Sequence, residues 1–370
     1  MSSTVSLDIP IETTSPMFNS SLDGDGQDPL FPNSAVRIVS LVALAIIVFL
    51  TAGGNLLVIL SVLLFQRLQT VTNYFITSLA VADFLVGAIV LPFSTAAIAH
   101  PEAWLYGATW CNLWVSIDVC ACTASVLNLF VIAVDRYIAI SSPFTYHVRL
   151  STTKAVTAIA VVWVASLLMS VFPIMAGLNT PDYRVQNIHN PTSCDFETNV
   201  FYTLIVGFLA FWVPLIGMCT VYIWLFKTAS EQARRIAAMD KAVATNHRHP
   251  TNMKRERKAA KTLGVIMGCF LVCWGPYIVY WTLKDACHFE VTMDAMNAMV
   301  WMGYLNSTMN PIIYAFFNKE FRNAFKKLLS CGSCQLPSKW RDSILNEPSV
   351  LSPTVAATAP QAAANVTSDC

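Results

Sequence analysis

The sequence is poor in charged residues for its length. Only 12% of its 370 residues are Asp, Glu, Lys or Arg, whereas a soluble globular domain has about 25%. The net charge of +1 gives the chain no general attraction for a polyanion, so we expect no nucleic-acid partner. The first 30 residues also lack the apolar core of a signal peptide. We therefore expect the first long apolar segment to direct the chain to a membrane.

Catalytic motifs are missing as well. The sequence shows no nucleophile–base pair, no phosphate-binding glycine loop and no zinc-like Cys/His spacing. These absences argue against an enzyme, and they leave no cofactor to expect beyond a bound ion.

Apolar residues, in contrast, make up 55% of the chain and gather in long runs. Seven runs approach or exceed the roughly 20 residues that a spanning helix needs. They lie at about 37–65, 72–98, 108–140, 153–175, 198–226, 258–283 and 293–316. We expect an all-α membrane protein, a bundle of seven transmembrane helices, followed by a short amphipathic inner helix at Lys319–Leu329.

The distribution of lysine and arginine predicts the orientation of this bundle. With the N-terminus outside, only Arg37, Arg184 and Lys284 of the 23 basic residues face outward, which leaves 20 inside. The predicted organisation is an extracellular tail at 1–36, a bundle with its inner helix at 37–334, and a disordered cytoplasmic tail at 335–370. Asn19 then lies outside as a glycosylation site.

The third run carries charges at both ends. Asp118 and Arg136 are 18 residues apart, which is about five helical turns and about 27 Å, so they project from the same face. An intramembrane charge costs about 2.5–3.5 kcal/mol on insertion scales, so each charge calls for a function. We expect one end to hold a cation from outside and the other to meet a partner inside.

A buried carboxylate needs a counter-charge, and no Lys or Arg faces Asp118 in the outer half of any run. In one interpretation a ligand ammonium supplies the charge, and aromatic faces complete the site by cation–π contact. The aromatic candidates lie on the last two runs: Trp274, Tyr277, Trp281, Trp301 and Tyr304. In the alternative, Asp118 is protonated or is hydrogen-bonded to a neighbour such as Tyr304.

Asp83 is a second lone intramembrane acid. Polar residues at a similar depth on other runs are Asn55, Ser125, Asn306, Ser307 and Asn310. Their oxygens suit a sodium ion, because hard cations prefer oxygen ligands. A plain hydrogen-bonded network between helices is the alternative, and the two are compatible.

At the inner end, Arg136 can pair with Asp135 or reach Glu256 at the start of the sixth run. A pair with Glu256 would be a latch between helices, and its opening would expose a cleft.

The cysteines divide by location. Cys111 and Cys194 both face the oxidising side, and we expect them to form a disulfide that ties the second outer loop over the bundle. Cysteines within the runs, such as Cys120 and Cys122, are expected to act as small packing residues. Cys331 and Cys334 follow the inner helix and are candidates for palmitoylation, which would anchor it to membrane lipid.

A set of motifs stands in order along residues 36–334. These motifs are Gly54-Asn55, LAVAD ending at Asp83, Cys111, Asp135-Arg136-Tyr137, Trp163, Pro214 with Tyr222, Phe270-x-x-x-Trp274-x-Pro276, and Asn310-Pro311-x-x-Tyr314. In this respect the chain resembles the rhodopsin-like (class A) G-protein-coupled receptors. The resemblance implies that Trp274 and Phe270 form a rotamer switch, that Tyr222 and Tyr314 stabilise the active state, and that Arg136 meets the Gα C-terminus.

Within that family the chain resembles the biogenic-amine branch, most of all Gs-coupled dopamine receptors and trace amine receptors. Asp118 then matches the aspartate that binds the protonated amine. Catecholamine receptors place serines before the proline of the fifth helix, but counting back from Pro214 gives Val206, Gly207 and Ala210. This apolar wall favours a less hydroxylated amine, because a site built for hydroxyls discriminates through its polar partners.

The resemblance implies a plasma-membrane receptor for a protonated biogenic or trace amine that activates Gs and raises cAMP. It also implies arrestin and receptor kinases as partners. A catecholamine or serotonin receptor is the alternative within the family. An opsin is excluded because Val291–Asn318 contains no lysine for a Schiff base. A secondary amine transporter is the alternative from another class, although it should show repeated halves with broken helices.

Overall fold

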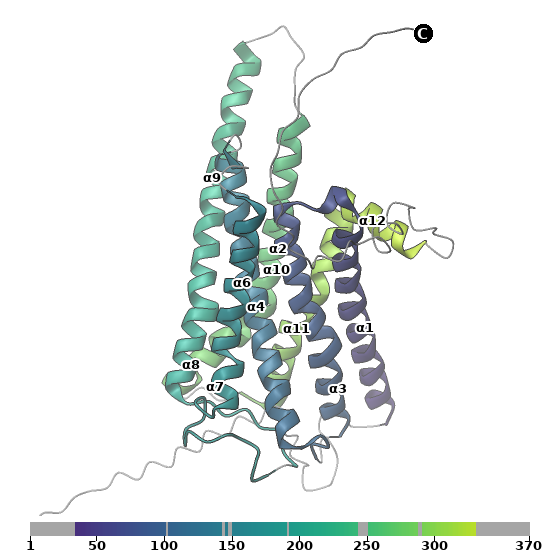
Figure 1. The fold of residues 1–370 in the computed structure, drawn as a ribbon, viewed down its shortest axis with the longest axis vertical. Coiled ribbons are helices and arrows are strands. Elements are labelled where there is room, and N and C mark those ends of the chain that lie inside the picture. Colours follow the sequence, from purple (N-terminus) through teal and green to yellow (C-terminus); the bar gives the residue numbers. More distant parts are fainter. Residues whose placement is uncertain are drawn as a thin grey trace, which may run out of the picture. The chain divides into compact units, whose positions relative to one another are not determined.

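The computed structural model describes residues 34–100, 103–142, 145–146, 150–190, 192–242, 251–287 and 291–330. In these residues all the regular structure is helical. The elements are α1 (Ser34–Leu64), η1 (Gln66–Leu68), α2 (Val71–Leu85), η2 (Val86–Val90), α3 (Leu91–Ala99), α4 (Gly107–Ser141), α6 (Thr152–Met169), α7 (Val171–Met175), α8 (Val200–Val206), η3 (Gly207–Trp212), α9 (Val213–Ala242), α10 (Thr251–Cys287), α11 (Met293–Phe317) and α12 (Lys319–Leu329). They form the predicted bundle, whose long helices lie side by side in Figure 1.

Polar residues define where several of these helices begin. The side chains of Thr70, Ser151, Asn199 and Thr292 accept hydrogen bonds from the backbone N–H three residues on. Each such cap satisfies one of the donors that the first helical turn leaves free. The inner helix α12 has the predicted bounds, and its buried face consists of Phe321, Ala324 and Phe325.

Two predicted helices are interrupted by a wider π-helical turn. The segments η2 and η3 end at Val90 and Trp212, each two residues before a proline, at Pro92 and Pro214. Proline lacks a backbone N–H and clashes with the preceding turn, so the chain there adopts i→i+5 bonding. The second and fifth spans therefore consist of several elements each.

Six helical segments in the described part are long and apolar enough to cross a membrane. The seventh span is α11, which has 25 residues but carries Asn306, Ser307, Thr308 and Asn310 in its inner half. Side chains that face outward are large and apolar on several helices, including Phe49, Val161, Phe201 and Phe316, each more than 60% exposed. A soluble monomer does not expose such surface, so these side chains face lipid.

Helix α4 is central in the bundle. In its most apolar window 67% of the residues are buried, against 17% for α1, and α4 contacts α2, α6, α7, α9 and α10. Helices α9 and α10 extend further than predicted, to Ala242 and from Thr251. Much of the segment between the two predicted runs, at about 227–257, is therefore helical, because its polar, alanine-rich sequence retains helix-forming residues.

Candidate functional site

Asp118 lies in the N-terminal half of α4 and is 5% exposed. Its Oδ2 accepts a hydrogen bond of 2.7 Å from the Tyr304 hydroxyl, and its Oδ1 accepts one of 3.4 Å from the Cys122 thiol. Both partners are neutral, and no Lys, Arg or His among the described residues pairs with the carboxylate. The contact with Tyr304 that one interpretation expected is present, yet it leaves the negative charge without a counter-ion.

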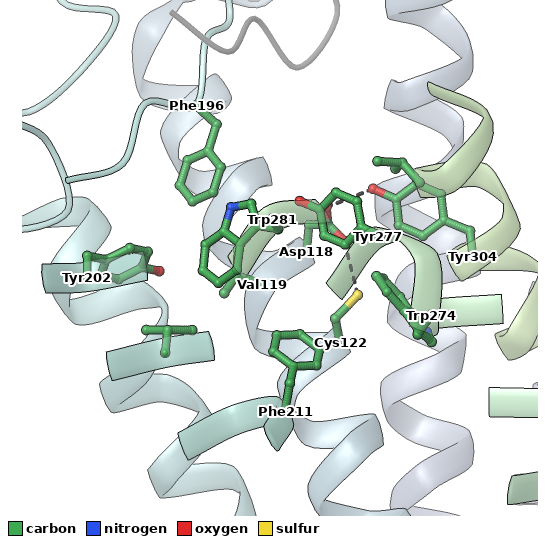
Figure 2. A pocket seen from close by; sticks show the side chains of 12 residues that line it. Asp118, Val119, Cys122, Phe196, Tyr202, Phe211, Trp274, Tyr277, Trp281 and Tyr304 are labelled. Atoms are coloured by element: carbon green, nitrogen blue, oxygen red, sulfur yellow. Dashed lines mark hydrogen bonds between the residues drawn. The ribbon is translucent and has the colours of Figure 1, made fainter. Parts of the chain in front are cut away.

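A cavity opens beside this carboxylate (Figure 2). It is lined by Asp118, Val119, Cys122, Phe196, Tyr202, Val206, Phe211, Trp274, Tyr277, Trp281, Val300 and Tyr304. The lining is apolar and aromatic apart from one carboxylate, which is the composition expected of a small-molecule site with one orienting charge.

Aromatic rings from α10 and α11 form one side of the cavity. Trp274 makes edge contacts with Tyr277 at 5.9 Å and Tyr304 at 6.4 Å between ring centroids, and a tilted contact with Phe211 at 6.3 Å. The opposite face of Trp274 rests on Gly303, where a Cβ would lie 3.0 Å from three ring atoms. A side chain at this position would force the indole to move away from α11 by a few tenths of an ångström.

The predicted disulfide between Cys111 and Cys194 is confirmed, with 5.6 Å between the two Cα atoms. It places Phe196, two residues further along, in the cavity lining. The side chain of Asn187 supports the loop, because its amide donates to the Asn112 Oδ1 at 2.9 Å and to the Asp195 carbonyl at 3.1 Å. The disulfide-tied loop therefore contributes Phe196 to the wall of the cavity.

Of the predicted ligand residues, six line the cavity: Asp118, Val206, Trp274, Tyr277, Trp281 and Tyr304. Ala210 is fully buried outside the lining, and Trp301 contacts Tyr304 edge-on from behind. The structure adds residues that the sequence did not single out, chiefly Phe196, Tyr202, Phe211 and Cys122. Cys122 differs from its expected packing role, because it lies one turn from Asp118 and donates to it.

Asp83 is the centre of a second polar cluster, closer to the inner face. Its Oδ1 accepts from Ser307 at 2.7 Å and from Ser125 at 3.3 Å, and its Oδ2 accepts from Asn310 at 2.7 Å. Asp83 is 0% exposed. The Nδ2 of Asn306 is buried without a hydrogen-bond partner, and Asn55 instead donates to the carbonyls of Thr51 and Ser307.

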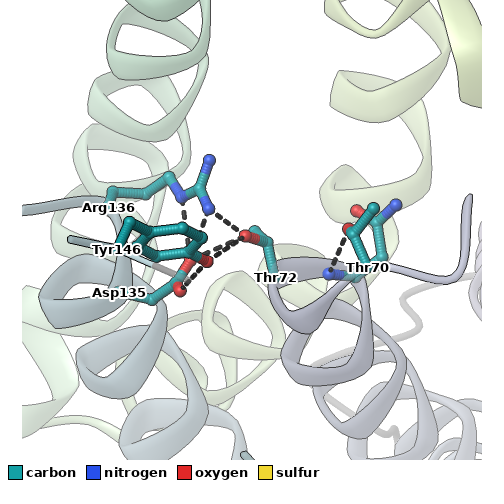
Figure 3. A network of polar contacts seen from close by, with 6 residues as sticks. Thr70, Thr72, Asp135, Arg136 and Tyr146 are labelled. Carbon is teal, nitrogen blue, oxygen red and sulfur yellow. Dashed lines mark hydrogen bonds and ion pairs between the residues drawn. The ribbon is translucent and has the colours of Figure 1, made fainter. Parts of the chain in front are cut away.

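Near the C-terminal end of α4, Asp135 is 1% exposed and holds a network of polar contacts (Figure 3). Arg136 donates to it from Nε at 2.9 Å and from a terminal nitrogen at 2.6 Å. Thr72 donates to it at 2.8 Å and Tyr146 at 2.7 Å. Arg136 also donates to the Thr72 hydroxyl. The predicted Asp135–Arg136 pair is present, and two hydroxyls that the sequence did not single out complete it.

The residues that the resemblance names as switch residues are packed inside the bundle. Phe270 is 1% exposed, and Tyr314 stacks on Phe321 of α12 with 5.4 Å between ring centroids. The hydroxyls of Tyr222 and Tyr314 are buried and make no hydrogen bond to any described residue. Tyr137 packs against Trp224 at 5.9 Å between ring centroids, and Pro311 contacts the side-chain-free face of Gly54.

Several predictions lie outside the described residues. They concern Asn19, Cys331 and Cys334, and the side chain of Glu256, whose backbone is in α10.

A seven-helix membrane bundle with a disulfide-tied outer loop, a charged cavity beneath it and an arginine network at the opposite end has the architecture of a seven-transmembrane receptor. Comparison with known proteins agrees. The family "7 transmembrane receptor (rhodopsin family)" matches residues 54–314.

The curated relatives are amine receptors by name. The chain is 37% identical over 317 residues to octopamine receptor beta-2R of Chilo suppressalis, covering 79% of each chain. It is 37% identical over 300 residues to the human histamine H2 receptor, covering 81% of each chain. The chain belongs to the rhodopsin family of seven-transmembrane receptors, which confirms the expectation of a receptor rather than an enzyme.

Proposed function

We propose that this protein is a receptor for a small protonated amine, whose ammonium pairs with Asp118. The observation that carries the proposal is a buried carboxylate beside an aromatic cavity, bound only to neutral donors. An ammonium ion supplies the missing charge, and the faces of Trp274, Tyr277 and Tyr304 add cation–π attraction. The names of the relatives, octopamine and histamine receptors, support the same ligand class.

Signalling follows from the two ends of α4. Amine binding favours the arrangement in which α10 swings outward about Pro276, because the ligand has a differential affinity for that arrangement. Arg136 then leaves Asp135 and joins the cleft that accepts Gα. We propose Gs as the coupled protein, with arrestin and receptor kinases as further partners. We also propose a plasma-membrane location with the N-terminus outside, on the distribution of basic residues.

The direct test is a panel of monoamines and polyamines on cells that express the receptor, with cAMP as the readout. We expect at least one protonated amine to raise cAMP and to be inactive on untransfected cells. Uptake of labelled amine into vesicles without G protein would instead indicate a transporter and would contradict the proposal.

The cavity wall at Val206, next to Gly207, argues against a catecholamine as the ligand. Val206 lines the cavity without a hydrogen-bonding side chain, and Gly207 has no side chain. Val206→Ser should therefore improve the potency of dopamine by about fivefold, because one net hydrogen bond stabilises by about 1 kcal/mol. Phenethylamine, which has no ring hydroxyl, is the matched control and should not gain. A gain of equal size for both amines would show that the hydroxyl is not the cause.

The cluster around Asp83 fits a sodium ion. Asp83, Ser125 and Ser307 would supply oxygen ligands, whereas the Asn310 amide donates to the carboxylate. A bound sodium ion would add a positive charge next to Asp83 and thus stabilise the arrangement in which these helices are packed together.

Asp83→Asn should remove the effect of sodium on the receptor. In the wild type we expect sodium chloride to raise the melting temperature of the purified protein more than choline chloride at the same ionic strength. In Asp83→Asn the two salts should act alike. If sodium stabilises the variant as much as the wild type, the cluster is a hydrogen-bonded network only.

A further inference from the structure

The wall of the ligand cavity next to η3 is completed by an indole ring from α10. Trp281 is 8% exposed and lines the cavity. A Cβ on Gly207 would lie 3.2 Å from Cζ3 and 3.7 Å from Cε3 of this indole. The ring therefore occupies the space that any other residue at position 207 would need, and Gly207 and Trp281 are complementary.

The Trp281 ring is held in this place through Thr282, the next residue in the sequence. The Trp212 Nε1 donates a hydrogen bond of 3.1 Å to the Thr282 hydroxyl, which itself donates to the Ile278 carbonyl at 2.8 Å. Gly207 and Trp212 are the two ends of η3. One end of η3, at Trp212, thus bonds Thr282 of α10, and the other end, at Gly207, packs against the indole of Trp281.

This packing determines which edge of the indole faces the ligand. The atoms Cε3 and Cζ3 belong to the six-membered ring, and the nitrogen lies on the other edge of the indole. Because the Cε3–Cζ3 edge contacts Gly207, the Nε1 is turned away from η3, and in Figure 2 it lies on the side of Phe196. Among the described residues the Trp281 N–H has no hydrogen-bond acceptor, and an indole N–H can only donate.

The hydroxyl groups of α8 on this side of the cavity already have hydrogen-bond partners. The Tyr202 hydroxyl donates to the Met169 carbonyl at 3.2 Å, and the Thr203 hydroxyl donates to Thr198 at 2.9 Å. Phe196, Val206 and Phe211 offer no polar atom. Tyr277 also lines the cavity, but its hydroxyl can donate or accept a hydrogen bond. It therefore does not discriminate between ligands that carry a donor and ligands that carry an acceptor.

We propose that Trp281 determines ligand specificity by donating a hydrogen bond from its indole N–H to an acceptor on the aromatic end of the amine. This inference rests on the proposed function, in which Asp118 holds the ammonium. The preferred class is an arylalkylamine that carries an oxygen or nitrogen acceptor on its ring, such as an aryl ether. An amine with a hydrocarbon ring substituent would cover the N–H and leave it without a partner, which is costly for a buried donor.

The test compares two amines of similar size, 4-methoxyphenethylamine and 4-ethylphenethylamine. Only the first carries a ring acceptor. Binding is measured as thermal stabilisation of the purified full-length receptor over a range of amine concentrations. On the wild type, we expect the methoxy compound to bind about fivefold to tenfold more tightly, which is the effect of one hydrogen bond.

Trp281→Phe keeps an aromatic ring on Gly207 but removes the N–H, so it should reduce this preference to less than about twofold. Trp110→Phe is the matched control, because Trp110 has a buried and unpaired Nε1 outside the cavity lining. It should keep the full preference. A preference that survives Trp281→Phe would overturn the proposal, as would equal binding of the two amines to the wild type.

The wild-type comparison needs no variant, so the proposal stays testable if Trp281→Phe does not fold. Failure of this inference can be distinguished from failure of the proposed function. If the two compounds stabilise the wild type equally, the role of Trp281 is wrong and the amine site stands. If no amine stabilises it, both are wrong.

Discussion

Asp118→Asn is expected to raise the amine concentration for a half-maximal cAMP response by at least about 100-fold. Removing one partner of a buried ion pair costs about 3–5 kcal/mol, and about 1.4 kcal/mol corresponds to a factor of ten. Asparagine has nearly the same shape and can still accept a hydrogen bond from Tyr304, which now bonds the carboxylate at 2.7 Å. The loss would therefore report the missing charge and not a collapsed cavity.

Tyr304→Phe is the matched control for this variant. It removes the hydroxyl that orients the carboxylate but leaves the charge, so potency should fall by only about fivefold to tenfold. Surface expression of each variant is measured with an antibody to an N-terminal tag. If Asp118→Asn reaches the surface and responds to amines with wild-type potency, the ammonium binds elsewhere and the proposed site is wrong.

Asp135→Asn is expected to raise signalling in the absence of any amine by several-fold. The Asp135 carboxylate accepts hydrogen bonds from Arg136, Thr72 and Tyr146, and it is 1% exposed. An amide in its place has no negative charge to hold the guanidinium. A shift of about 1 kcal/mol between inactive and active arrangements changes their ratio about fivefold.

Two weaker variants give a graded comparison. Tyr146→Phe and Thr72→Val each remove one neutral donor and leave the ion pair, so basal cAMP should rise less than in Asp135→Asn. Basal cAMP is normalised to the amount of receptor at the cell surface. Equal basal signalling in Asp135→Asn and wild type would mean that this network does not restrain the receptor.

The helices and the two charged ends of α4 could be predicted because they depend on local sequence. Apolar length defines a span, and the 18-residue spacing of Asp118 and Arg136 defines a shared face. The pair of outer cysteines likewise predicted the loop bridge that the structure contains.

The fifth span shows why the wall of the cavity could not be predicted in full. Counting along an ideal α-helix places Val206 and Ala210 on one face, but η3 bonds i→i+5 between them. Val206 and Phe211, five residues apart, line the cavity instead, and Ala210 is turned away. The sequence signal was Pro214, which indicates an irregular turn without giving its register.

Contacts between segments that are far apart in the sequence could not be predicted from local sequence patterns. Phe196 enters the cavity because of the bridge at Cys194, and Tyr146, which follows α4 in the sequence, donates to Asp135. Neither residue belongs to a periodic pattern. Such side chains could be proposed only after the helices had been placed in space.

The flat contact between Trp274 and Gly303 bears on how quickly the Trp274 ring exchanges between rotamers. A ring that rests on a bare backbone meets no methyl group when it turns, so its exchange between rotamers has a low steric barrier. Alanine at position 303 would add such an obstacle and lengthen the lifetime of each rotamer. With 5-fluorotryptophan at position 274, the fluorine resonance should then broaden or split. Such a change would show that the glycine at position 303 sets the rate at which the Trp274 ring exchanges between rotamers.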